Sequence, residues 1–141
     1  MIRTVKGKKH TLICLLCVAV FVSGCGQKHK EGEPDVISSI KMNQDEMLTV
    51  VANRNQIENK EEFAKLLIQM CKENSFHTIK FSTDRGYATS LHMRVYLWRD
   101  KIEGYDPVMT VEFEPAEYGQ GYDIVHDSEQ FDLFVDGKLC E

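Results

Sequence analysis

Alternating apolar residues in two segments constrain the fold of this chain more than any other feature. Leu91 to Trp98 and Val108 to Glu114 carry apolar side chains at every second position. This period is typical of a β-strand with one buried face. A turn about Glu103-Gly104 would join them as an antiparallel hairpin in which Val95 faces Val111. A slip of one residue would move the apolar side chains to the other face, so the pattern specifies which face is buried.

A third strand is predicted for Phe76 to Ser82, joined to Leu91 by a hairpin about Gly86, with Phe81 facing Leu91. The same registers arrange the opposite face of this antiparallel meander in rows with adjacent opposite charges, which favours the pairing. These predicted rows are Lys80, His92 and Glu114; Thr78, Arg94 and Glu112; Phe76, Tyr96 and Thr110; and Trp98 with Val108.

One main helix is predicted to cover the apolar face of the meander. Asn59 is a good N-cap, and Glu62 three residues later completes a capping-box pattern. The helix is expected to end at Asn74-Ser75. Its apolar stripe has helical spacing and contains Phe63, Leu66, Leu67, Met70 and Cys71.

The remaining segments have weaker patterns. Leu48 to Ala52 is a strand candidate that precedes the helix, so it can pair in parallel with a later strand through a right-handed crossover. Asp35 to Glu46 is expected to form a short packed turn of helix. Phe131 to Val135 is another strand candidate, and the turn signal Asp136-Gly137 could return the chain as a short strand at Leu139 and Cys140. The predicted class is α+β.

The N-terminus has the pattern of a targeting signal. Its basic head contains no acidic residue and is followed by the uncharged apolar segment Leu12 to Val22. Eleven residues are too few to span a hydrocarbon core of about 30 Å as a permanent helix, but they suit the apolar region of a signal peptide. The basic residues are Arg3, Lys6, Lys8 and Lys9.

The tetrapeptide Val22-Ser23-Gly24-Cys25 resembles the lipobox of bacterial lipoproteins. The resemblance implies that Cys25 receives a diacylglycerol and that a signal peptidase cuts before it. It therefore predicts a signal peptide at 1–24, a lipidated cysteine with a flexible tether at 25–35, and one domain at 36–141. The alternatives are an ordinary secretory signal with an incidental cysteine and an uncleaved anchor helix.

A second resemblance concerns the mature chain. The stretch Gln56-Ile57-Glu58-Asn59, Phe63 and the segment Thr78 to Thr83 are similar to part of a family of small lipoproteins from Gram-positive bacteria. That family is a domain of unknown function. The resemblance implies a lipid-anchored location on the outer leaflet of the cell membrane, and it implies no activity.

The charge and the cysteine content of the chain limit the classes of partner and the covalent links that we expect. The chain has 17 basic and 22 acidic residues, and this acidic balance argues against a nucleic-acid partner, since such partners require basic surface. After cleavage and lipidation, Cys71 and Cys140 remain. Export permits a disulfide between them, but the position of Cys71 on the helix stripe favours a buried free thiol. The expected partners are the membrane, through Cys25, and an envelope protein or peptide.

The candidate binding surface is an aromatic corner on the sheet face opposite the helix, formed by Phe76, Tyr96, Trp98 and Val108. Exposed clustered aromatics suggest a platform for a peptide, a sugar ring or a partner protein. The competing interpretation is that the C-terminal segment, with Ile124, Phe131 and Phe134, folds back over them as a second small core. The sheet would then be the middle layer of a closed sandwich.

The alternative to a binding surface is a metal site. His92 and Glu114 share a predicted row, and His126 or Asp127 could add a ligand. The simpler interpretation is an exposed histidine–carboxylate pair, because a site normally needs three or four ligands. The acidic run from Asp123 to Asp132 lacks the spacing that wraps one Ca²⁺ ion. We therefore predict no cofactor.

No catalytic motif stands in the sequence, and no catalytic residue is predicted. The function expected from the sequence is a membrane-anchored extracytoplasmic lipoprotein that acts as a non-catalytic binding or interaction module at the cell envelope. The alternative is a metal-dependent or other hydrolase at the same location.

Overall fold

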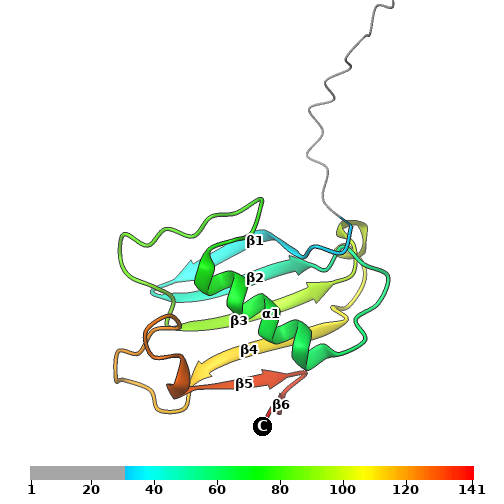
Figure 1. Ribbon diagram of the computed structural model, residues 1–141. Coiled ribbons are helices and arrows are strands. Elements are labelled where there is room, and N and C mark those ends of the chain that lie inside the picture. Colours follow the sequence, from blue (N-terminus) through cyan, green and yellow to red (C-terminus); the bar gives the residue numbers. More distant parts are fainter. Residues whose placement is uncertain (1–30) are drawn as a thin grey trace, which may run out of the picture.

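The protein folds as a six-stranded mixed sheet with one main helix on one face, which confirms the predicted α+β class. The computed structural model describes residues 31–141; the predicted signal peptide, Cys25 and residues 26–30 of the predicted tether lie outside this range. Figure 1 shows the strands in sequential order across the sheet with α1 lying over them. The elements are β1 (Asp35–Met42), β2 (Asp45–Val51), α1 (Lys60–Glu73), β3 (Ser90–Tyr96), β4 (Met109–Pro115), β5 (Phe131–Val135) and β6 (Lys138–Leu139), with 3₁₀ turns at Arg99–Lys101 and Ser128–Gln130.

The helix α1 connects the two strands that pair in parallel. β2 and β3 are neighbours, with Val50 opposite Val95, while every other pair of adjacent strands is antiparallel. The predicted cap is confirmed: the Asn59 side chain accepts a hydrogen bond from the Glu62 amide at 3.0 Å. The early strand therefore joins the sheet through a helical crossover, as its position before the helix predicted.

The core lies between α1 and the face of the sheet that α1 covers. Sheet residues such as Val50, Val95 and Val111 are fully buried against Leu67 of the helix. Leu66, which was predicted for the apolar stripe, is 42% exposed. The buried helix residues are Phe63, Ala64, Leu67, Ile68, Met70 and Cys71.

The segment 35–46 is not the predicted turn of helix. It forms β1, a tight turn with Asn43 at a positive φ of 58°, and the start of β2. A β-bulge between Val36 and Ser38 shifts the register by one residue. The bulge interrupts the alternation of side chains, which hid the strand in the sequence.

The predicted strand Phe76–Ser82 and its hairpin with Leu91 are wrong, because this segment has no regular secondary structure. Two side chains from elsewhere hold its backbone. Asn74 donates to the carbonyl of Phe81 at 3.0 Å and accepts from its amide at 2.8 Å. The Asp35 carboxylate accepts from the amides of His77 and Thr78. The position beside β3 that this segment was expected to fill is taken by β2.

The hairpin of β3 and β4 is confirmed, but its register differs by two residues from the prediction. Val95 lies opposite Met109, not Val111. A shift of two keeps every side chain on its predicted face. The loop between them contains the 3₁₀ turn Arg99–Lys101, and the Val108 amide donates to the carbonyl of Val95.

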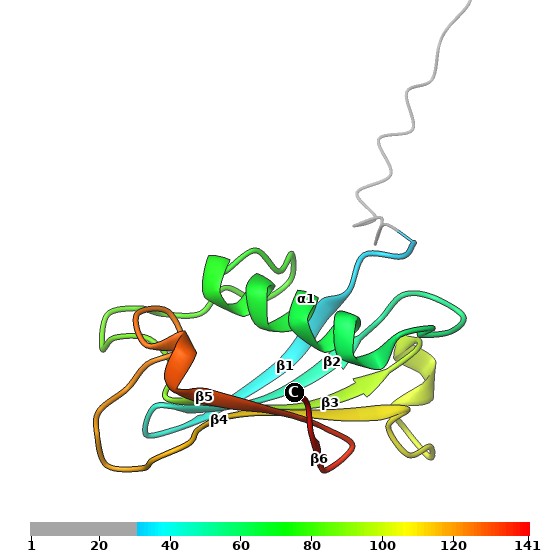
Figure 2. The same cartoon turned by 60° about the horizontal axis from the view of Figure 1, so that its bottom comes forward.

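The C-terminal segment extends the sheet and does not build a second core, so the closed-sandwich alternative is wrong. β5 pairs with β4, and the predicted turn places Asp136 and Gly137 at positive φ before β6. Ile124 and Phe131 join the core beneath α1. Figure 2 shows the result, a two-layer molecule in which the helix lies on one side of the sheet.

Candidate functional site

The sheet face opposite α1 carries no helix or strand layer among the described residues, and we call it the open face (Figure 2). Strand pairing arranges its side chains in cross-strand rows. One row contains Ile40, Met47, His92, Glu112 and Phe134. The next contains Ser38, Thr49, Arg94 and Thr110. The face is therefore apolar toward β1 and charged over β3 and β4.

The apolar part of the open face is formed by Ile40, Met42 and Met47, which we call the β1–β2 patch. Their exposed fractions are 56%, 59% and 39%, respectively. Ile40 and Met47 are direct cross-strand partners, and Met42 is two residues further along the same face of β1. A group of exposed apolar side chains on an edge strand and its neighbour marks a surface suited to binding.

A shallow hollow of about 270 Å³ lies on the open face beside the β1–β2 patch. Four strands contribute to its lining, and Ile40 and Met47 are its exposed apolar residues. Its polar lining consists of Ser38, Thr49, His92, Arg94, Thr110 and Glu112. Recognition sites combine apolar side chains with convergent polar groups that fix the orientation of the ligand.

His92 and Glu114 are in contact, as predicted, at 3.3 Å between Nε2 and Oε1. The pair is diagonal, because the direct partner of His92 in the sheet is Glu112. The other oxygen of Glu114 accepts a hydrogen bond from the Tyr118 hydroxyl at 2.8 Å. This bond to Glu114 raises the pKa of Tyr118 above its ordinary value. Within residues 31–141 no three histidine, cysteine or carboxylate side chains form a group that could hold a metal ion.

The four residues of the predicted aromatic corner do not form one exposed surface. Phe76 is fully buried in the core on the helix side, because its segment is not a strand. Tyr96 belongs to the open-face side of β3 but is only 3% exposed. Trp98 is half-buried and Val108 is 39% exposed, both near the β3–β4 loop. The expected cluster is reduced to these last two.

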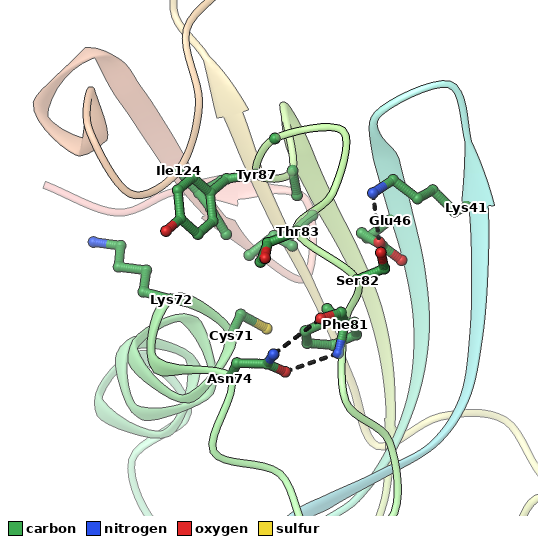
Figure 3. A pocket seen from close by; sticks show the side chains of 13 residues that line it. Lys41, Glu46, Cys71, Lys72, Asn74, Phe81, Ser82, Thr83, Tyr87 and Ile124 are labelled. Carbon is green, nitrogen blue, oxygen red and sulfur yellow. Dashed lines mark hydrogen bonds and ion pairs between the residues drawn. The ribbon is translucent and has the colours of Figure 1, made fainter.

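A small cleft of about 30 Å³ lies between the C-terminal end of α1 and the segment 81–88 (Figure 3). It has room for about one water molecule. Cys71 lines it, and burial together with the negative charge of Glu46 raises the pKa of this thiol far above its ordinary value. A thiol that stays protonated is a poor nucleophile. Both Cys71 and Cys140 are free thiols.

His126 lies in a turn, and its ring makes an edge-on contact with the ring of Tyr87. Its Nδ1 is 2.9 Å from Asp123 Oδ2, and the other Asp123 oxygen accepts from the amides of Val125 and His126. The hydrogen bond to Asp123 raises the pKa of His126. His126, the candidate for a further ligand, thus bonds within a local turn and is not brought to His92 and Glu114.

Sequence reasoning missed the β1–β2 patch because β1 was not recognised. The available signal was the pairing of Ile40 and Met42 at a spacing of two, with Asn43 after them as a turn residue. The register predicted from the sequence also placed Arg94 opposite Glu112. The structure places Arg94 between Thr49 and Thr110, because β2 is its neighbour on one side and β4 is shifted by two.

Comparison with known proteins gives no relative. No family model, no curated protein and no solved structure matches the chain. Among the described helices, none has the length and apolarity needed to cross a bilayer.

Proposed function

We propose that this protein is a lipoprotein, anchored through Cys25 on the extracytoplasmic face of the cell membrane, that binds an envelope protein or peptide through its open face. The basic head, the short apolar segment and Val22-Ser23-Gly24-Cys25 support the anchor. Two acyl chains, at about 0.8 kcal/mol per buried methylene, hold a protein stably on a bilayer.

The observation that carries the binding role is the exposed apolar part of the open face. A sheet normally buries one face and exposes a polar one, whereas here the open face presents Ile40, Met42 and Met47 beside a hollow. Each Å² of apolar surface buried on binding contributes about 25 cal/mol, which would favour association there. The proposed occupant is a macromolecular segment, because the hollow extends over four strands.

The short tether supports a partner at the envelope. The Gly32 amide donates to the Asn53 carbonyl at 2.6 Å, and the Asn53 side chain donates to the carbonyl of Glu33 at 2.8 Å. The domain is thus fixed from Gly32 onward. Six residues lie between Cys25 and Gly32, and the seven Cα–Cα steps allow a reach of about 25 Å at full extension. A domain held this close to the bilayer meets partners in or near the membrane.

Site-specific photocrosslinking tests the proposal. A photoreactive amino acid at Met47 on the open face of the membrane-bound protein should give a discrete crosslinked product. The matched control is the same group at Leu66, an exposed apolar residue of α1 on the other side of the molecule. Discrete products at Met47 and not at Leu66 support the proposal. Equal products at both sites, or none at Met47, would contradict it.

A further inference from the structure

The hollow on the open face contains a cation that forms no ion pair with the described residues, Arg94. Arg94 is exposed, and it forms no ion pair or side-chain hydrogen bond with any of residues 31–141. Some cations of the described chain have ion-pair partners, whereas the exposed Arg85 and Arg99, like Arg94, have none. Lys60 pairs with Asp136 at 2.6 Å, and Lys65 pairs with Glu61 at 2.7 Å. In a chain with 22 acidic residues, a lone arginine at the centre of a sheet is a local charge opposite to that of the whole molecule.

Hydroxyl groups flank this arginine on both sides. Thr49 of β2 and Thr110 of β4 are the direct cross-strand neighbours of Arg94, and Ser38 of β1 is the neighbour of Thr49. None of these three hydroxyls has a hydrogen-bond partner among the described residues. A guanidinium presents several N–H donors in a fixed plane, which matches a carboxylate. The row thus offers one cation and adjacent hydroxyl donors to an anionic group.

We infer that the row Ser38, Thr49, Arg94 and Thr110 is a carboxylate-binding subsite that recognises an aspartate or glutamate side chain of an extended partner segment. The inference rests on the proposed function, of which it names the ligand chemistry. Charge complementarity carries it: Arg94 forms no ion pair within residues 31–141 and its direct cross-strand neighbours are neutral hydroxyl residues, while Glu112, the carboxylate of the lining, lies in the adjacent row.

The β1–β2 patch specifies what lies next to the carboxylate. Ile40 and Met47 occupy the row adjacent to that of Arg94, two residues along the strands, which is about 7 Å. In an extended peptide, side chains on one face recur at the same distance. The partner segment therefore has an apolar residue two positions from its acidic residue.

Glu112 weakens the binding of a carboxylate at this subsite. It lies one row from Arg94, opposite His92, and forms no ion pair with Arg94. Its carboxylate repels an incoming carboxylate at this short range. Neutralising it by Glu112→Gln should tighten binding of an acidic peptide severalfold, whereas Arg94→Gln should abolish the preference for the acidic peptide.

The test uses the full mature lipoprotein in lipid nanodiscs, with its methionine methyl groups labelled for NMR. The probes are a capped pentapeptide, Leu-Thr-Glu-Thr-Leu, and the same peptide with Gln in place of Glu. The Met47 methyl reports on the hollow, and the methyl of the buried Met93 reports on the intact core. We expect a saturable shift of the Met47 signal with the Glu peptide and at least tenfold weaker binding of the Gln peptide.

Two variants separate a specific subsite from general charge. Arg94→Gln should remove the preference for the Glu peptide while the Met93 signal stays unchanged. Arg99→Gln, which alters an exposed arginine of the β3–β4 loop, should leave binding unchanged. Equal binding of both peptides, absence of a Met47 shift, an equal effect of the two variants, or displacement of the Glu peptide by equimolar inorganic phosphate would each overturn the inference. If any of these overturning results is obtained together with a discrete Met47 photocrosslink, the proposed function is supported and the carboxylate subsite is refuted.

Discussion

The carboxylate of Asp35 connects the first strand to the segment that follows the helix, and its removal is the perturbation whose cost the structure defines best. Asp35 is 3% exposed. Its Oδ1 accepts from the amides of Val36, His77 and Thr78 at 3.0, 2.9 and 3.1 Å, and its Oδ2 accepts from the Thr78 hydroxyl. These bonds hold residues 77 and 78 against β1, so Asp35→Ala should release them.

The magnitude follows from which donors lose their partner. Hydrogen bonds to a charged group contribute about 1.5–3 kcal/mol each, and a buried donor left unpaired costs about 1–3 kcal/mol. Val36 is fully buried, whereas His77 and Thr78 are exposed and can bond to water. We therefore expect Asp35→Ala to lower the free energy of unfolding by about 3 kcal/mol, a large part of the 5–15 kcal/mol typical of a domain. Asp35→Asn keeps a neutral acceptor and should cost about 1 kcal/mol.

Urea denaturation followed by tryptophan fluorescence measures both variants, because Trp98 is the single tryptophan of the chain. The free energies of unfolding of the two variants and the parent are compared at neutral pH. The reasoning is refuted if Asp35→Ala costs less than about 1 kcal/mol, or if Asp35→Asn costs as much as Asp35→Ala.

Three further predictions concern the helix end, a turn and a thiol. Asn74 has a φ of 53°, and its side chain bonds to both backbone groups of Phe81. In the same assay, Asn74→Gly should lower the free energy of unfolding by about 1–2 kcal/mol, because these bonds are lost, and Asn74→Ala by about 1 kcal/mol more, because alanine is strained in the left-handed region. Equal costs for the two variants would contradict this. The His126 pKa is raised by Asp123, so this pair stabilises the fold fully below the unfolded-state pKa of His126 and loses its effect as pH rises through the folded-state value. Asp123→Asn should lower that folded-state pKa in an NMR titration, and an unchanged value would refute the pairing. Buried Cys71 should resist iodoacetamide in the native protein at pH 8, whereas the half-buried Cys140 reacts; equal labelling would contradict the burial of Cys71.

Elements with local signals were predictable from the sequence. The helix has its own cap at Asn59 and an apolar stripe, and β3 and β4 have uninterrupted alternation. β1 was not, because the bulge after Val36 breaks its period and Ile40 then fits a helical spacing from Val36 as well as a strand.

The segment 76–82 shows the opposite failure. Its alternation of Ile79 and Phe81 resembles a strand, but side chains distant in sequence decide its conformation. Asp35 lies 42 residues before His77, and no local pattern announces that bond. The apolar side chains still reach the edge of the core, so the alternation predicted burial correctly and secondary structure incorrectly.

The candidate site was predicted in part for the same reason. Faces survive a register error of two residues, so Arg94 and His92 were assigned to the correct side of the sheet. A register error of two does change the cross-strand neighbours of each residue, and in the structure Arg94 is flanked by threonines in place of the expected Glu112. That Arg94 has no ion-pair partner among residues 31–141 therefore follows only from the three-dimensional pairing.

The central claim is that the domain is held at the membrane by lipid on Cys25, and intact-mass spectrometry of the protein purified from its native cells tests it most directly. We expect a chain that begins at Cys25 and carries the mass of a thioether-linked diacylglycerol. A product that retains Met1, or one with an unmodified thiol at Cys25, would contradict it.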